Sequence, residues 1–109
     1  GTAAVLEMLL QSYHEELHFL PALPPAWSKG TIKGLRARGG YTVNMEWENG
    51  RLTRAEITPL TDRTCTILHG ADRYAVTNAS GDPVACRKEG HRMRFEVEGG
   101  QSYVVIAAD

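Results

Sequence analysis

Residues 41–48 constrain the fold more than any other stretch, because apolar and polar side chains alternate there without a break. The apolar members are Tyr41, Val43, Met45 and Trp47. Strict alternation is typical of a strand with one buried face. The pair Asn49-Gly50 follows and favours a two-residue hairpin turn in which both residues have positive φ. The pattern therefore predicts a β-hairpin near the middle of the chain.

The partner strand is predicted at residues 51–60. Leu52 is out of phase with Ala55 and Ile57, so we expect a β-bulge between Leu52 and Ala55. Further short strands are predicted at residues 17–19, 31–37, 64–69, 73–77, 83–87, 92–98 and 102–107. The apolar run at 104–106 indicates that the last strand is buried on both faces. The predicted fold is mostly β: an antiparallel two-sheet β-sandwich, with the jelly roll as one arrangement that fits.

The N-terminal segment has a different character. Strong helix formers occupy residues 2–11, and apolar side chains cover nearly every side of such a helix. We expect one short N-terminal α-helix there, and either a homodimer formed through it or fraying, because one sandwich can cover only one of its sides. Pro21, Pro24 and Pro25 lack an N–H and fix φ, so residues 21–26 are predicted as a stiff extended connector.

Composition excludes several classes of function. The 109 residues carry a net charge of −1, which provides no basic surface for nucleic acid or an anionic membrane. No apolar run reaches the roughly 18 residues that a membrane-spanning helix needs, and no basic region follows Gly1, so we expect no signal peptide here. Cys65 and Cys86 are predicted as buried thiols. A disulfide between them stays open, because it would require their strands to pair.

Four polar residues are candidates for a domain interface. His14 and His18 are four residues apart, with no Cys or third His nearby in the sequence. We therefore predict that they pack or hydrogen-bond, and we predict no bound metal or cofactor. Arg36 and Arg38 alternate to one face of a strand. They either face solvent or dock against carboxylates of another domain, because the planar guanidinium donates two bonds at once.

The aromatic and acidic residues allow two interpretations each. A set of aromatics could build a sugar-stacking platform: Trp27, Tyr41, Trp47, Tyr74 and Tyr103. The shared phase of Tyr41 and Trp47 within one strand favours the core instead. Most carboxylates stand on the polar phase of a strand or in a turn, which is typical of solvated charge and not of catalysis.

Half of the chain carries motifs of a known family. The matching segments are EMLLQS at 7–12, His14, LHFLPALPPAW at 17–27, Gly30, IKGLRARGGY at 32–41 and EW at 46–47. In these segments the chain resembles the C-terminal end of the family 95 glycoside hydrolases, which are inverting α-L-fucosidases. Long runs at fixed separation make this resemblance specific.

The resemblance implies a division of the chain and a role for it. Residues 1–26 would be the last helix and the proline-rich connector of a catalytic (α/α) barrel, and residues 27–109 a C-terminal β-sandwich. The sandwich would pack on the barrel of a secreted or periplasmic parent protein and stabilise it. The family's catalytic residues lie upstream of the matching segments, so we assign none here and expect the chain alone to be inactive. The alternative is a carbohydrate-binding module for fucosylated glycans.

Overall fold

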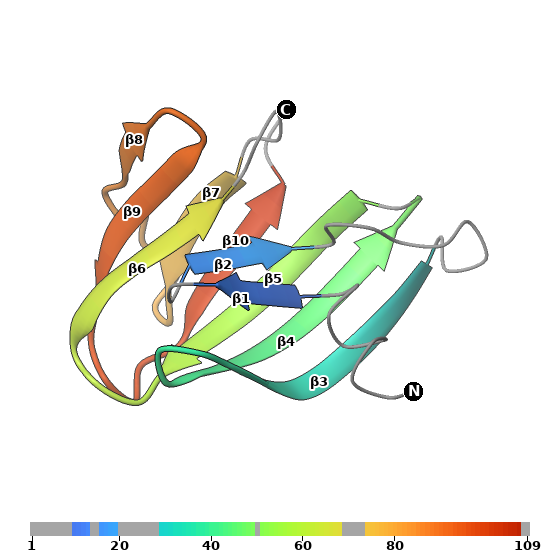
Figure 1. Ribbon diagram of the computed structural model, residues 1–109, viewed down its shortest axis with the longest axis horizontal. Coiled ribbons are helices and arrows are strands. Elements are labelled where there is room, and N and C mark those ends of the chain that lie inside the picture. The colour runs from blue at the N-terminus through green and yellow to red at the C-terminus, as the bar shows by residue number, and fades with distance from the viewer. Residues whose placement is uncertain (1–9, 14–15, 20–28, 50, 69–73, 108–109) are drawn as a thin grey trace.

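The computed structural model describes residues 10–13, 16–19, 29–49, 51–68 and 74–107, which form two five-stranded sheets that face each other (Figure 1). The β4 sheet has the order β3-β4-β5-β10-β7. Its strands are β3 (Lys29–Ala37), β4 (Tyr41–Glu48), β5 (Arg51–Pro59), β10 (Tyr103–Ala107) and β7 (Tyr74–Asn78). The β6 sheet has the order β1-β2-β6-β9-β8. Its strands are β1 (Leu10–Tyr13), β2 (Glu16–Phe19), β6 (Arg63–Leu68), β9 (Arg92–Val97) and β8 (Arg87–Glu89).

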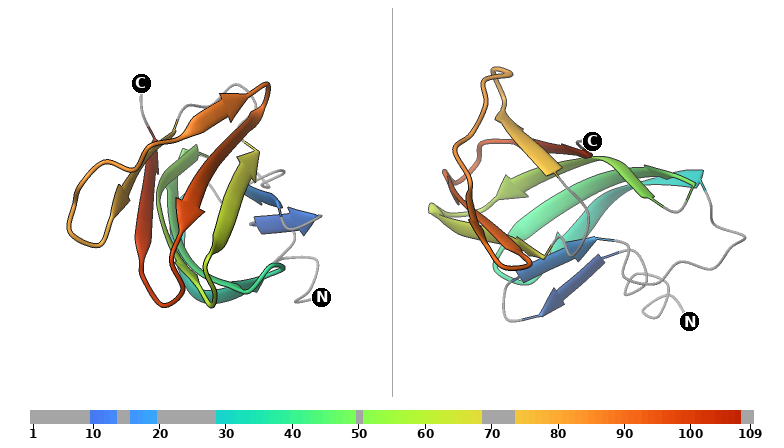
Figure 2. Two further views of the ribbon diagram at one scale, coloured as in Figure 1. Left: turned by 90° about the vertical axis from the view of Figure 1, so that its left-hand side faces the viewer. Right: turned by 90° about the horizontal axis from the view of Figure 1, so that it is seen from above.

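The predicted two-sheet β-sandwich is confirmed, with one exception to the antiparallel pairing. The chain passes between the sheets after β2, β5, β6, β7 and β9, whereas β3, β4 and β5 follow one another within one sheet. Strand β2 pairs with β6 in parallel, whereas the other ladders are antiparallel. The β1–β2 hairpin closes the side of the sandwich next to β3 (Figure 2).

The predicted N-terminal helix is wrong. Leu10 and Gln11, placed in that helix from the sequence, lie in β1, and no helix occurs among the described residues. A helix of about ten residues is marginal by itself, whereas β1 satisfies its backbone by pairing with β2 from Leu10↔Phe19 to Tyr13↔Glu16. Residues 1–9 lie outside the described part, as does the dimer contact predicted through them. Within the described ranges, no helix is long and apolar enough to cross a membrane.

The core follows the alternation of the central hairpin. Every odd residue of β4 is buried, and Met45 and Trp47 are 1% and 7% exposed. Asn49 has a φ of 55°, as the predicted turn requires. The predicted bulge in β5 is also confirmed, because the ladder shifts from Glu46↔Arg54 to Trp47↔Leu52 and so keeps Leu52 in the core.

Two strand predictions near the C-terminus need correction. Strand β10 is not buried on both faces. Val105 faces the core and is fully buried, but Ile106 is on the outer face of the β4 sheet and is 41% exposed. The edge strand predicted at 83–87 is also wrong, since β8 begins only at Arg87. Pro83 forms a single isolated bridge with Thr77, and its missing N–H disfavours a longer ladder.

Both cysteines are free thiols, but only Cys65 is buried as predicted, whereas Cys86 is half-buried. Cys65 pairs with Phe95 in β9, whereas Cys86 directly precedes β8, which pairs with the other edge of β9. Two strand spacings amount to roughly 10 Å, beyond the roughly 7 Å between Cα atoms that a disulfide can bridge. Burial raises the pKa of the Cys65 thiol to about 12, so this thiol is chemically inert in the folded chain.

We expect Trp47→Ala to lower the free energy of unfolding by about 3–5 kcal/mol, because it removes a large ring from the core. The ring lies directly over Gly30, where an added Cβ would come within 2.5 Å of Trp47 Cζ2. Urea unfolding of the chain measures the change. Ile106→Ala serves as the exposed control and should cost under about 1 kcal/mol. A Trp47→Ala loss as small as that of the control would place the ring at the surface.

The cysteines give a second test of the packing. A thiol reagent should label Cys86 in the folded chain and reach Cys65 only after denaturation, because reactivity follows the exposure and the pKa of the thiol. Mass spectrometry of the labelled peptides separates the two positions, and Cys86→Ala provides the control with no fast label. Fast labelling of Cys65 in the native chain would contradict its position in the core.

Candidate docking surface

The structure brings together two of the four predicted interface residues. Arg36 lies near the end of β3 on the outer face of the β4 sheet, and Arg38 lies in the turn at 38–40; both are exposed. His14 is outside the described residues, and for His18 only the backbone position in β2 is described. The predicted role of the histidines therefore stays a prediction, and the geometry below concerns the arginines.

Three connections meet beside these arginines, at the lower end of the sandwich in Figure 1. They are residues 38–40, 60–62 and 98–101, which we call the turn platform. The Leu60 N–H donates to the Gly40 carbonyl at 2.7 Å, and the Gly100 N–H donates to the Pro59 carbonyl at 2.8 Å. The Gly99 N–H donates to Asp62 Oδ1 at 2.8 Å. These bonds fix the three connections relative to one another.

The glycine pair in the Arg-Ala-Arg-Gly-Gly motif is explained by this turn. Gly39 and Gly40 have φ of 95° and 81°, a region that L-residues enter at a cost of roughly 1–2 kcal/mol each. A Cβ on Gly39 would also lie 2.9 Å from Nη1 of Arg63 and 3.0 Å from Cε2 of Tyr41. Glycine is therefore required at Gly39 both for the backbone conformation and for space.

Arg63 ties the two sheets together at the turn platform, a role that the sequence did not reveal. It begins β6, in the opposite sheet, and its Nη1 donates to the Gly39 carbonyl. Its guanidinium carbon lies 5.2 Å from the centre of the Tyr41 ring, within the range of a cation–π contact. Tyr41 in turn reaches the Thr64 carbonyl with its hydroxyl at 3.5 Å. Contacts from the β6 sheet thus fix the position of the turn.

Leu60 projects from the turn platform and is 67% exposed. A Cβ built on Gly40 would lie 3.5 Å from Leu60 Cβ, so the Leu60 side chain stands against the glycine turn. The sequence contained a signal for it, because Leu60, directly after β5, is an apolar residue that continues the polar phase of the strand, two positions after Thr58. Arg36 lies on the same outer face, in the row of Thr58, through the pairings Arg36↔Thr42 and Thr42↔Thr58.

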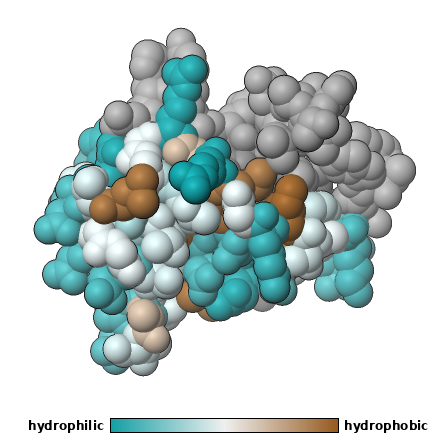
Figure 3. Space-filling model, turned by 90° about the horizontal axis from the view of Figure 1, so that it is seen from below, coloured by the Kyte–Doolittle hydropathy of each residue, from teal (hydrophilic) through white to brown (hydrophobic). Residues whose placement is uncertain are grey.

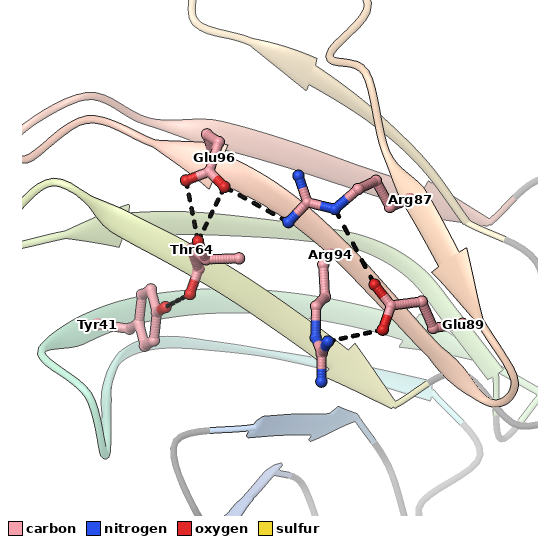
Figure 4. Close-up of polar contacts among 6 residues, drawn as sticks. All are labelled: Tyr41, Thr64, Arg87, Glu89, Arg94 and Glu96. Carbon is pink, nitrogen blue, oxygen red and sulfur yellow. Dashed lines mark hydrogen bonds and ion pairs between the residues drawn. The ribbon is translucent and has the colours of Figure 1, made fainter.

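The outer face of the β6 sheet has the opposite character, because its charges pair with one another (Figure 4). Glu89 binds Nη1 of Arg94 at 2.7 Å, and Glu96 lies 3.5 Å from Nη2 of Arg87. The Thr64 hydroxyl also donates to Glu96, at 2.8 Å. Farther along, Arg92 pairs with Glu16 of β2, which raises the pKa of the arginine. These carboxylates lie on an open strand face and form no enclosed acid–base pair.

Two adjoining hollows lie over β3, β4 and β5. Their volumes are about 250 and 210 Å³, and both border Thr31 and Glu46.

The aromatic side chains that the structure describes are all buried: Phe19, Tyr41, Trp47, Tyr74, Phe95 and Tyr103. None of them can form the exposed platform on which a sugar ring would stack; Trp27 lies outside the described part. No group of three His, Cys, Asp or Glu residues that could hold a metal occurs among the described residues.

Comparisons with known proteins agree on one family. The family model described as glycoside hydrolase family 95, C-terminal domain, matches residues 11–105. Over 51 residues the chain is 55% identical to alpha-L-fucosidase 2 from Arabidopsis thaliana, an alignment that covers 46% of this chain and 6% of that protein. Over 60 residues it is 40% identical to probable alpha-fucosidase A from Aspergillus oryzae (strain ATCC 42149 / RIB 40), covering 50% and 8%. The alignments thus span less than a tenth of either relative.

We expect Gly39→Ala to destabilise the chain more than Gly81→Ala, although both glycines have positive φ. A Cβ on Gly81 meets nothing within 4 Å, whereas a Cβ on Gly39 meets Arg63 and Tyr41. The control should cost about 1–2 kcal/mol for its backbone alone, and Gly39→Ala should cost at least about 1 kcal/mol more through overpacking. Chemical denaturation measures both. Equal costs would show that Arg63 does not hold the turn.

Proposed function

Because the chain belongs to the C-terminal domain family of glycoside hydrolase family 95, we propose that it is the non-catalytic β-domain of an α-L-fucosidase-like enzyme. In this proposal the sandwich packs on the catalytic (α/α) barrel of a longer parent protein and stabilises it. The match of the C-terminal domain family to residues 11–105 carries the proposal. We propose further that the parent is secreted or periplasmic, as expected from the family resemblance.

The chemistry of the described residues supports a non-catalytic role. Inverting glycosidases need an acid and a base roughly 6.5–9.5 Å apart, on either side of a bound sugar. Glu89 and Glu96 are instead engaged by arginines on an exposed sheet face. Asp62 accepts a backbone N–H within the turn platform. We therefore propose that the acid and the base are supplied by another part of the parent.

The carbohydrate-binding alternative has less support. Recognition of a sugar ring by stacking needs an exposed aromatic face, and the described aromatic side chains are buried in the core. The hollows over β3–β5 are lined mainly by polar and charged residues, among them Lys33, Asn44 and Glu56. Asn44 is already engaged, because its side chain donates to Glu56 at 3.0 Å and accepts the Gly34 N–H at 2.8 Å. We do not advance sugar binding as a second function.

The experiment compares three proteins: the chain alone, the parent protein, and the parent without this domain. The chain alone should release no fucose from a fucosylated oligosaccharide. Removing the domain should lower the temperature at which the parent unfolds, because the barrel surface beneath the sandwich loses its cover. Light scattering and calorimetry follow folding, and fucose release follows activity.

Two results would contradict the proposal. The first is that the chain alone releases fucose above the buffer control and that Glu16→Gln abolishes this release. That result would place an active site within these 109 residues. The second is a parent whose unfolding temperature is unchanged after the domain is removed. Lys88→Gln in the chain, at an exposed position of β8, is the matched surface control for Glu16→Gln.

A further inference from the structure

We propose that the turn platform is the face through which this domain docks on the catalytic domain, with Leu60 entering an apolar socket and Arg36 and Arg38 meeting carboxylates at its border. This inference rests on the proposed function and adds to it the face, the anchor and the chemistry of the partner surface. The occupant is the catalytic domain of the same protein, because the matching family is that of a C-terminal domain and the alignments cover only 6% and 8% of the two relatives.

Leu60 carries the inference because it is both exposed and held in place. A single exposed leucine is common on protein surfaces, so exposure alone does not indicate a docking site. Here the backbone at Leu60 is bonded to Gly40, and its carbonyl oxygen would lie only 2.7 Å from a Cβ on Gly99. The backbone that carries the Leu60 side chain therefore has little conformational freedom to lose on docking, and such preorganisation strengthens binding.

The neighbouring charges indicate what surrounds the socket. The Arg36 side chain forms no ion pair or hydrogen bond with the residues that the structure describes, and both Arg36 and Arg38 are exposed. A guanidinium group binds a carboxylate through two parallel hydrogen bonds. The partner surface should therefore present Asp or Glu on the arginine side.

The other outer faces fit an interface less well. On the β6 sheet, docking would have to remove water from the Arg87, Glu89, Arg94 and Glu96 network, and burying paired charges costs more than it returns unless every group is satisfied. Figure 3 shows the molecule from below, where hydrophobic side chains surface only in small, separate groups among polar ones. A docking face of this kind relies on a few anchors and not on a broad apolar patch.

The test places a single reporter thiol on the proposed face. Leu60→Cys is introduced in a Cys86→Ala background, both in the chain alone and in the full-length parent, and labelling of the peptide that carries position 60 is followed by mass spectrometry. Labelling should be about tenfold slower or more in the parent, because a thiol covered by an interface reacts slowly. Ile106→Cys, 41% exposed on the same sheet away from the platform, should change by less than about twofold.

A charge variant adds a second readout. Arg36→Glu in the parent should lower its unfolding temperature more than Arg36→Ala, because a reversed charge faces the carboxylates, and neither variant should shift the unfolding of the chain alone by a comparable amount. Equal labelling of position 60 in both proteins would overturn the inference. If position 106 were protected instead, the domain would dock through the β10 side of the β4 sheet, and the proposed function would survive while this inference failed. If neither position were protected, this inference would fail, and the domain-removal experiment would decide the proposed function separately.

Discussion

The contact on which this fold and its proposed role depend is the one that Arg63 makes with the 38–40 turn. The two sheets of a sandwich are joined mainly by apolar packing, which is not directional. Arg63 adds a directional tie, because it leaves the β6 sheet, lies over Tyr41 and donates to the carbonyl of Gly39. Only glycine leaves room for that approach. The position of the turn is therefore set by both sheets at once.

This tie links the core to the surface that we propose for docking. Tyr41 is one of the largest buried side chains, and it begins the strand from which the central hairpin is built. The same turn presents Arg38 and supports Leu60 through Gly40. A rigid core can thus hold the backbone beneath an exposed leucine and two arginines in a fixed arrangement. A supporting domain needs this property, because a flexible surface would lose much of its binding free energy to ordering.

The features of the fold that depend on residues close together in the sequence could be predicted from it. Alternation identified β4, and the phase of Leu52 against Ala55 located the bulge in β5. The prediction from sequence failed where pairing with another strand determines the conformation. Residues 10–11 favour a helix locally, but they lie in β1 because they pair with β2. At the surface, the motif itself singled out Arg36 and Arg38. Leu60 and Arg63 were missed, because their importance comes from contacts with Gly40 and Gly39, which lie 20 and 24 positions earlier in the sequence.

The central claim is that the platform end of the sandwich is covered in the intact protein. Hydrogen exchange of backbone amides, measured on the chain alone and on the full-length parent, tests it most directly, because exchange reports protection segment by segment. The account predicts slower exchange in the parent at residues 36–40 and 60–62, with the 79–82 loop and β8 unchanged. Unchanged exchange at the platform, with new protection along β8 and β9, would contradict it and place the interface on the outer face of the β6 sheet.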